Sequence, residues 1–470
     1  MYKSMRRIAP LLLVAVLSAL TSSALGQAVE TAAEPLPALP DHWRKHYIRE
    51  TIFGSTVFVA EAGKQGRPVV LLVHGLGQAG MTDWLTVVPA LERDYHVIAL
   101  DLPGFGRSES PRGKYSPTNY AAVLHQVKTR FSRGPAHVVG HSMGGAVTLR
   151  YTADYPQHVS SAVLVDAAGI LNRTAFVKHS AGAVIDEREM PIMLEGLRGL
   201  LARYSDAILE TVGNWPDPTG ALGEFEMLWG AVMVDNTNVN AALALVNEDF
   251  TDAVLRNDTP TQVIWGSDDN VTPLRTGTLL AGRMANAQLH VIEGAKHVPM
   301  KSHTKTFNRL LLDALKTPPS KAVNEQQNRG SLKLTGERGR TYSGAYEAIE
   351  IRNSRELKLS GVTANSITIV DSIVELENVN VDAGDGLALL LERSRVLGTN
   401  LGLRGGMGMI VAGSTLDIAG LDIQARGTGV EVVYPSEGIF SISRIESGRR
   451  HRDVHGQFSL GLGVMESALP

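Results

Sequence analysis

Cysteine is absent from all 470 residues, so the chain can form no disulfide bond and can carry no lipid on an N-terminal cysteine. A strong net charge is also lacking, because the formal net charge is only -3. No run of Lys and Arg with interleaved aromatic residues occurs, which removes the usual reason to expect a nucleic-acid partner.

Acidic residues are missing from the beginning of the chain until Glu30. Lys3, Arg6 and Arg7 precede the apolar run Ile8 to Leu20, which is too short to span a bilayer comfortably. Basic residues, an apolar run and small residues after it predict a cleavable signal peptide over 1–28, with an uncleaved anchor as the alternative. We therefore expect a secreted or periplasmic protein with no transmembrane segment after signal removal.

Short apolar strand patterns alternate with helical patterns through the first two thirds of the chain, which predicts an α/β fold around a mostly parallel sheet. The expected strands are His46–Ile52, Thr56–Ala60, Pro68–Val73, Val97–Leu100, Ala136–Val139, Ala162–Val165, Thr261–Trp265 and Gln288–Ile292. Helical periodicity without strands between about 170 and 257 predicts an inserted helical cap. The α/β domain is expected over 45–317, after a proline-containing linker over 29–44.

The segment Gly140-His141-Ser142-Met143-Gly144 stands between a buried strand and a helix. Such a strand-to-helix turn forces the serine hydroxyl outward, and glycines on either side avoid backbone clashes. Free N–H groups at the beginning of the helix would face any negative charge that develops nearby. Ser142 is therefore the candidate nucleophile.

A serine hydroxyl needs a base within hydrogen-bond reach and an acid that orients the base. His297 follows the last expected strand and is the candidate base, with His74 and His141 as rivals. The candidate acids are Asp268, Asp269 and Asp166, each of which follows a strand. These residues lie where the carboxyl ends of parallel strands meet, which is the usual place for a site in such a sheet.

Together these motifs resemble the α/β-hydrolase superfamily, with greatest similarity to bacterial lipases and carboxylesterases. The segments that carry the resemblance are His74-Gly75-Leu76-Gly77, Asp101 to Ser108, the Ser142 turn, Gly266-Ser267-Asp268-Asp269 and His297. The resemblance implies Asp269 as the acid and an oxyanion hole made by the backbone N–H groups of Leu76 and Met143. It implies no metal and no organic cofactor.

Hydrolases that cleave carbon–carbon bonds in aromatic ring-cleavage products are the nearest alternative within that superfamily. They usually carry Asn before the serine and Trp after the histidine, whereas this chain has His141 and Val298. The prediction is a secreted serine hydrolase that cleaves a small-molecule or lipid carboxylic ester through an acyl-enzyme.

The C-terminal third contains a repeat of about 20 residues, marked by Ser354, Ser372, Ser394, Ser414 and Ser436. Alternating apolar residues around these serines predict an all-β repeat domain over 333–470, a small right-handed parallel β-helix, with an irregular β-sandwich as the alternative. A polar linker is expected over 318–332, with few packing contacts crossing it.

The repeat domain contains none of the residues expected to carry the chemistry, so its role stays open. It could contact the cell envelope or a polymer, and a glycan-binding or envelope-binding protein with the hydrolase unit as an accessory is the second hypothesis. The competing idea is that the repeats pack over the cap and complete the pocket or stabilise the core.

Overall fold

The computed structural model describes residues 36–175, 237–320, 329–448 and 450–468. The predicted signal peptide, the beginning of the 29–44 linker, the cap between 176 and 236 and the linker residues 321–328 lie outside the described residues. The described residues within Asp41–Pro470 belong to one compact unit. None of the described helices is long and apolar enough to cross a membrane.

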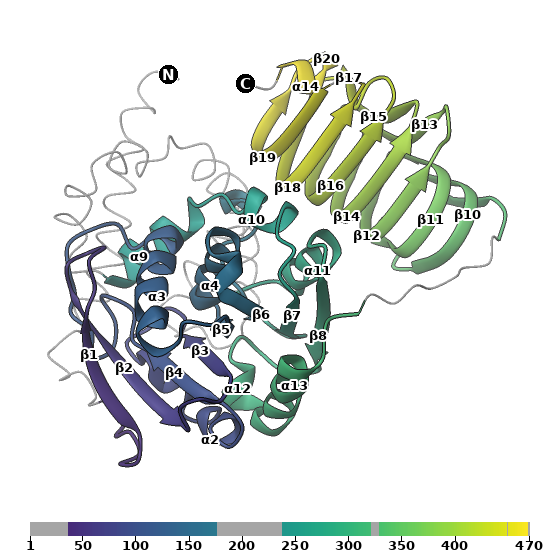
Figure 1. Cartoon of the computed structure of the whole chain (residues 1–470). Helices are drawn as coiled ribbons and strands as arrows, with labels where there is room; N and C mark the ends of the chain where they lie inside the picture. Colours follow the sequence, from purple (N-terminus) through teal and green to yellow (C-terminus); the bar gives the residue numbers. More distant parts are fainter. Residues whose placement is uncertain (1–35, 176–236, 321–328, 449, 469–470) are drawn as a thin grey trace, which may run out of the picture. The chain divides into compact units, whose positions relative to one another are not determined.

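The first part of the described chain is built on an eight-stranded sheet in the order β1-β2-β4-β3-β5-β6-β7-β8 (Figure 1). Its strands are β1 (Arg44–Arg49), β2 (Thr56–Gly63), β3 (Val69–Val73), β4 (His96–Leu100), β5 (Ala136–His141), β6 (Val159–Val165), β7 (Thr261–Gly266) and β8 (Ala287–Ile292). At one edge, β1 pairs with β2 and β2 with β4 in antiparallel fashion. The strands from β4 through β3, β5, β6 and β7 to β8 pair in parallel. The predicted α/β fold is confirmed.

Helices cover both faces of this sheet, with α3, α4 and α11 on one face and α2 and α13 on the other (Figure 1). The helices are η1 (Gly80–Trp84), α2 (Val88–Leu91), α3 (Pro117–Phe131), α4 (Met143–Asp154), η2 (Pro156–His158), α9 (Thr237–Val246), α10 (Thr251–Leu255), α11 (Leu274–Arg283), α12 (Pro299–Ser302) and α13 (Thr304–Lys316). Because both faces are covered, every residue of β3, β4 and β7 is buried.

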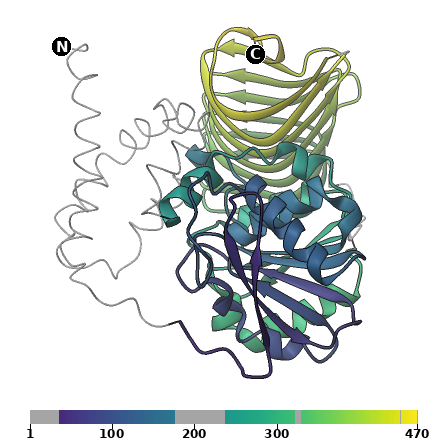
Figure 2. The same cartoon turned by 60° about the vertical axis from the view of Figure 1, so that its left-hand side comes forward.

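The C-terminal part is a second sheet, with twelve strands that pair mostly in parallel. Its elements are β9 (Leu332–Thr335), β10 (Thr341–Arg352), β11 (Leu357–Val370), β12 (Ile373–Asp382), β13 (Leu387–Glu392), β14 (Arg395–Gly405), β15 (Met407–Ala412), β16 (Thr415–Ala425), β17 (Val430–Tyr434), β18 (Ser436–Ser447), β19 (Arg450–Leu460), β20 (Gly463–Val464) and α14 (Met465–Ala468). The turned view in Figure 2 shows how strongly these strands curl.

From β12 to β18, pairing in this sheet skips one strand along the chain. β12 pairs with β14 and β14 with β16, while the shorter strands between them pair β13 with β15 and β15 with β17. The predicted all-β region with a repeating strand pattern is confirmed. The finer expectation, a right-handed β-helix, stays a prediction.

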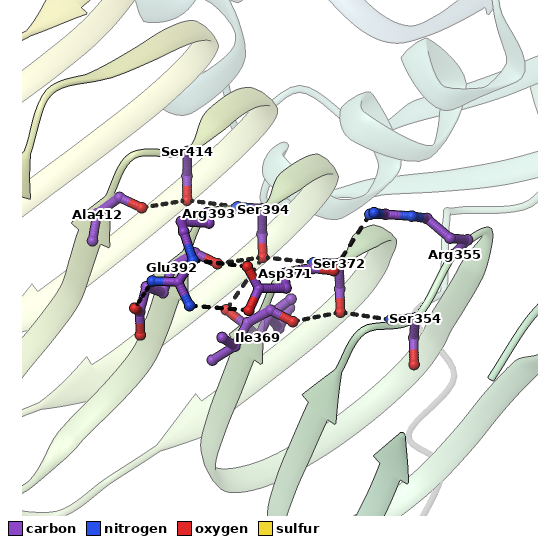
Figure 3. Close-up of polar contacts among 11 residues, drawn as sticks. Ser354, Arg355, Ile369, Asp371, Ser372, Glu392, Arg393, Ser394, Ala412 and Ser414 are labelled. Atoms are coloured by element: carbon purple, nitrogen blue, oxygen red, sulfur yellow. Dashed lines mark hydrogen bonds and ion pairs between the residues drawn. The ribbon is translucent and has the colours of Figure 1, made fainter. Parts of the chain in front are cut away.

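The repeated serines form a buried ladder through the C-terminal sheet (Figure 3). The backbone N–H of Ser354 donates to Ser372 Oγ at 3.0 Å, and the same bond links Ser372 to Ser394 and Ser394 to Ser414, both at 3.1 Å. Each hydroxyl in turn donates to the carbonyl two residues before it, as Ser372 does to Val370 O. The serine ladder therefore supplies hydrogen-bond partners to buried backbone groups at the turns, where the backbone pairing of the strands is interrupted.

The α/β part and the C-terminal part contact each other more extensively than the sequence predicts. Arg275 and Arg283 on α11 make ion pairs with Asp417 and Asp422 on β16. Ala419 on β16 and two isoleucines of β18 also belong to the apolar core of the α/β part. The expectation that few packing contacts cross between the two parts is therefore wrong for the described residues, because local sequence patterns carry no signal for such long-range pairs.

Replacing Ser394 with Ala should lower the stability of the protein by about 1–3 kcal/mol, because the buried N–H of Ser372 loses its acceptor. Thr415→Ala is the matched control, since Thr415 is exposed and lies one residue beyond a ladder serine. Thermal unfolding of both variants checks the prediction. Equal melting temperatures for the two variants would show that the ladder is dispensable.

Candidate active site

Ser142 occupies a sharp turn between β5 and α4. Its backbone lies at φ 53° and ψ -120°, a conformation that L-residues rarely adopt. The neighbouring chain leaves no room for side chains: a Cβ on Gly140 would lie 2.0 Å from Gly144 O, and one on Gly144 would lie 2.2 Å from Val73 O. The two glycines are therefore required by backbone packing, and the turn has the form expected of a nucleophile elbow.

The structure brings Ser142, His297 and Asp269 together from three different strand ends. His297 Nε2 lies 3.0 Å from Ser142 Oγ, and His297 Nδ1 lies 2.9 Å from Asp269 Oδ2. Because a carboxylate can only accept, Nδ1 carries the proton and Nε2 is left free to accept the serine hydroxyl. This is the arrangement that a serine nucleophile with its base and orienting acid requires.

Asp269 is held as an anion by the turn that follows it. Its Oδ1 accepts the N–H groups of Val271 and Thr272, and its Oδ2 accepts the Thr272 hydroxyl at 2.5 Å. Burial alone would raise the pKa of Asp269, but hydrogen bonding to His297, the charge of His297 and the two bonds from Thr272 outweigh it and lower the pKa. The carboxylate is thus charged and fixed in direction.

The two alternative acids are placed differently. Asp268 is exposed, and its carboxylate accepts from the hydroxyl of Ser267. Asp166 is buried beside the site, where Oδ1 accepts from Gly266 N; burial, reinforced by the charge of Asp269, raises its pKa well above the usual range. Only Asp269 among the three reaches His297 within the described residues.

The two rival histidines have other partners. His74 Nδ1 donates to Gly75 O at 2.6 Å, and its Nε2 accepts from Leu102 N, so this ring ties the loop after β3 to the loop after β4. His141 Nε2 donates to His297 O at 2.7 Å. Burial, with the neighbouring charge of His297, lowers the pKa of His141 to about 4, so its ring is neutral near pH 7.

Two backbone N–H groups are available near the serine. Among the residues that the structure describes, neither Leu76 N nor Met143 N has a hydrogen-bond acceptor, whereas the next N–H in the first loop, that of Gly77, donates to Asn238 Oδ1 at 3.0 Å. Met143 is also the first residue of α4, so the positive end of the helix dipole adds to its N–H. These two groups suit an oxyanion hole.

A cavity of about 510 Å³ opens beside the base and is lined by Asn270, Lys296, His297, Val298, Lys301 and Ser302. No group of three or more His, Asp or Glu residues in the described ranges could hold a metal ion. The hydrogen bonds that join Ser142, His297 and Asp269 suit nucleophilic attack by a serine with proton transfer through a histidine.

Sequence reasoning missed two residues that support the site. Thr272 stands three residues after Asp269 and donates to it, a spacing that a turn built around the aspartate would have suggested. Asn238 reaches the Gly77 N–H from α9, 161 residues away along the chain, and no local pattern indicates such a contact.

Replacing Asp269 with Asn should lower kcat on the order of 10³ to 10⁴ fold, as loss of the orienting acid does in other triads, because an amide cannot hold the same imidazole tautomer. Asp268→Asn, which removes the exposed neighbouring charge, should have a far smaller effect. Steady-state kinetics of the two variants measure the difference. The reverse ranking would assign the acid to Asp268.

The chain shares moderate sequence similarity with proteins of known and unknown function. A protein of unknown function from Mycobacterium bovis is 26% identical over 309 residues, which cover 61% of this chain and 86% of that protein. A 2-hydroxy-6-oxononadienedioate/2-hydroxy-6-oxononatrienedioate hydrolase from a Pseudomonas species is 27% identical over 283 residues, covering 57% of this chain and 94% of that enzyme.

Among solved structures, an esterase from Exiguobacterium antarcticum covers 58% of this chain and 100% of its own, with 20% identity and a TM-score of 0.43. That likeness is too distant to say what this chain acts on. The sequence model of the α/β-hydrolase fold, in contrast, matches residues 68–304, a range that contains Ser142, Asp269 and His297. This match spans half of the chain and places the triad inside it: the chain belongs to the α/β-hydrolase fold family.

Proposed function

We propose that this protein is a serine hydrolase that cleaves carboxylic esters through an acyl-enzyme on Ser142. The observation that carries the proposal is the continuous chain of hydrogen bonds from Ser142 Oγ through His297 to Asp269. A serine hydroxyl is a poor nucleophile near neutral pH, and His297, at the middle of these hydrogen bonds, is the base that would make it reactive.

In the first step Ser142 Oγ attacks the ester carbonyl carbon while its proton passes to His297 Nε2. The carbonyl oxygen becomes an oxyanion, which the N–H groups of Leu76 and Met143 would stabilise. Asp269 stabilises the imidazolium that forms. When the tetrahedral intermediate collapses, the C–O bond breaks and His297 returns the proton to the departing alcohol.

Water then completes the reaction by the same route in reverse. His297 Nε2 takes a proton from a water molecule, the hydroxide attacks the acyl carbon, and the second tetrahedral intermediate releases the carboxylic acid as Ser142 Oγ regains its proton. Each step needs only the groups named, and the products are one alcohol and one carboxylic acid.

Cleavage of a carbon–carbon bond in an aromatic ring-cleavage product is the second candidate. It is favoured by the sequence similarity to the Pseudomonas ring-cleavage hydrolase. Two residues next to the triad support the ester instead: hydrolases of the ring-cleavage type usually carry Asn before the serine and Trp after the histidine, where this chain has His141 and Val298.

We also propose that the protein acts outside the inner membrane. The support is the N-terminal sequence, in which Lys3, Arg6 and Arg7 precede an apolar run followed by small residues, as in a cleavable signal peptide. The absence of cysteine is compatible with either a reducing or an oxidising compartment and does not weigh on this proposal.

A substrate panel decides between the two reactions. We expect the full-length protein to hydrolyse at least one p-nitrophenyl ester, in a series from short to long acyl chains, with a higher kcat/KM than a ring-cleavage dienoate. Ser142→Ala is the control, and it should lose turnover because the nucleophile is gone. A preference for the dienoate that also depends on Ser142 would replace the ester assignment with carbon–carbon cleavage.

A further inference from the structure

Helix α11 begins directly after the turn that holds the catalytic acid. Asp269 accepts hydrogen bonds from Val271 and Thr272, and α11 starts at Leu274. The position of the helix's first turn therefore sets the position of the groups that orient the Asp269 carboxylate. If the helix shifted, the short segment between Leu274 and Thr272 would move with it, and so would the groups that bond the carboxylate.

The C-terminal sheet binds this first turn through a single arginine. Arg275 Nη2 donates to Gly398 O at 3.0 Å and to Asp417 Oδ1 at 3.2 Å. The side chains of Arg275 and Asp417 are only 17% and 23% exposed, so the ion pair is largely shielded from water. A charge-assisted bond of this kind is directional as well as strong.

The middle of α11 is fitted closely against two corners of the C-terminal sheet. Asn400, which turns the chain at φ 55°, donates from Nδ2 to Thr278 O at 2.6 Å. A Cβ on Gly282 would lie 2.1 Å from that same Nδ2, and a Cβ on Gly420 would lie 2.6 Å from Leu279 Cδ1. Glycine on each side thus permits the approach, and the helix has little freedom to slide.

The far end of α11 carries a second ion pair of the same kind. Arg283 lies 3.3 Å from Asp422, and the two side chains are 15% and 24% exposed. The two arginines have the same chemistry, similar burial and partners on the same strand, β16. They differ in position, because Arg275 is three residues after Thr272 and Arg283 is at the opposite end of the helix, and Arg275 donates in addition to Gly398 O.

A second contact reaches the loop beside the nucleophile. Ala168 N donates to Ser142 O at 3.1 Å, and a few residues later Asn172 N donates to Ser441 Oγ at 2.8 Å and Thr174 Oγ1 to Gln457 Oε1 at 3.0 Å. The loop that follows β6 is thus bonded to the nucleophile at one end and to the C-terminal sheet at the other.

We propose that the C-terminal sheet braces the catalytic acid, with Arg275 as the positioning residue that transmits the brace to Asp269. The proposal rests on the role proposed for Asp269 in the triad. It assigns the repeat region a part in the activity, even though none of its residues touches the Ser142, His297 or Asp269 side chains among the described contacts.

Arg275→Gln should loosen the first turn of α11 and weaken the Asp269–His297 bond. Because the Asp269 carboxylate favours the protonated form of the imidazole that it contacts, weakening that bond should move the acid limb of the pH profile to lower pH. We expect kcat on a soluble ester to fall by about tenfold, since small misplacements of catalytic groups are costly. KM should change little.

Arg283→Gln is the matched control in the full-length protein. It removes an equivalent ion pair and should lower the melting temperature to a similar extent, yet leave kcat and the pH profile near those of the wild type. Arg275→Lys should restore part of the kcat, because the charge opposite Asp417 is kept. Asp417→Asn should reproduce the shift seen with Arg275→Gln and provides a second variant if the first does not fold.

The rate at which a fluorophosphonate labels Ser142 gives the same comparison without a substrate. Equal losses in the Arg275 and Arg283 variants, or an unshifted pH profile in Arg275→Gln and Asp417→Asn, would overturn the brace and leave a purely stabilising contact. Failure of the proposed function looks different: the wild-type protein would then prefer the dienoate to every ester of the panel, or Ser142→Ala would keep the ester hydrolysis of the wild type, whatever the arginine variants do.

Discussion

The hydrogen bond between Asp269 and His297 is the interaction on which the candidate site depends. It requires a carboxylate to stay charged although it is buried, and this is unfavourable unless the oxygens are well supplied with donors. The Thr272 hydroxyl and the N–H groups of Val271 and Thr272 provide those donors. With the carboxylate fixed, His297 presents Nε2 to Ser142, and the serine is held out on a strained turn that only glycine neighbours allow.

The strand order of the sheet explains why these residues can meet. Ser142, Asp269 and His297 follow β5, β7 and β8, whose carboxyl ends lie at one edge because the strands are parallel. That arrangement is readable in the sequence, since buried strands, a glycine-flanked serine and strand-terminal Asp and His residues are local patterns. Choosing Asp269 over Asp268 needed the family resemblance, because both follow the same strand. The contact of Asn238 with Gly77 joins distant segments and has no local signature.

In the C-terminal region, too, some features are predictable from a local sequence pattern and others are visible only in the structure. The spacing of the serines reveals the repeat, and the structure adds its physical role: the hydroxyl of each ladder serine after Ser354 accepts the backbone N–H of the preceding ladder serine. Arg275 and Asp417 carry no motif, and they are 142 residues apart, so their pairing could not be predicted from sequence. The sequence pattern suggests that this region is a separate domain, whereas in the structure its residues contact α11 and hold that helix in place.

Mass-spectrometric mapping of the residue that a fluorophosphonate modifies tests the central claim most directly, because the reagent reacts with an activated serine whatever the natural substrate is. We predict one stable adduct, on the peptide that contains Ser142, formed much faster than at any other serine because His297, oriented by Asp269, lies within hydrogen-bond reach of Ser142 Oγ. An adduct on another serine, or no adduct from a folded protein at any pH, would contradict it.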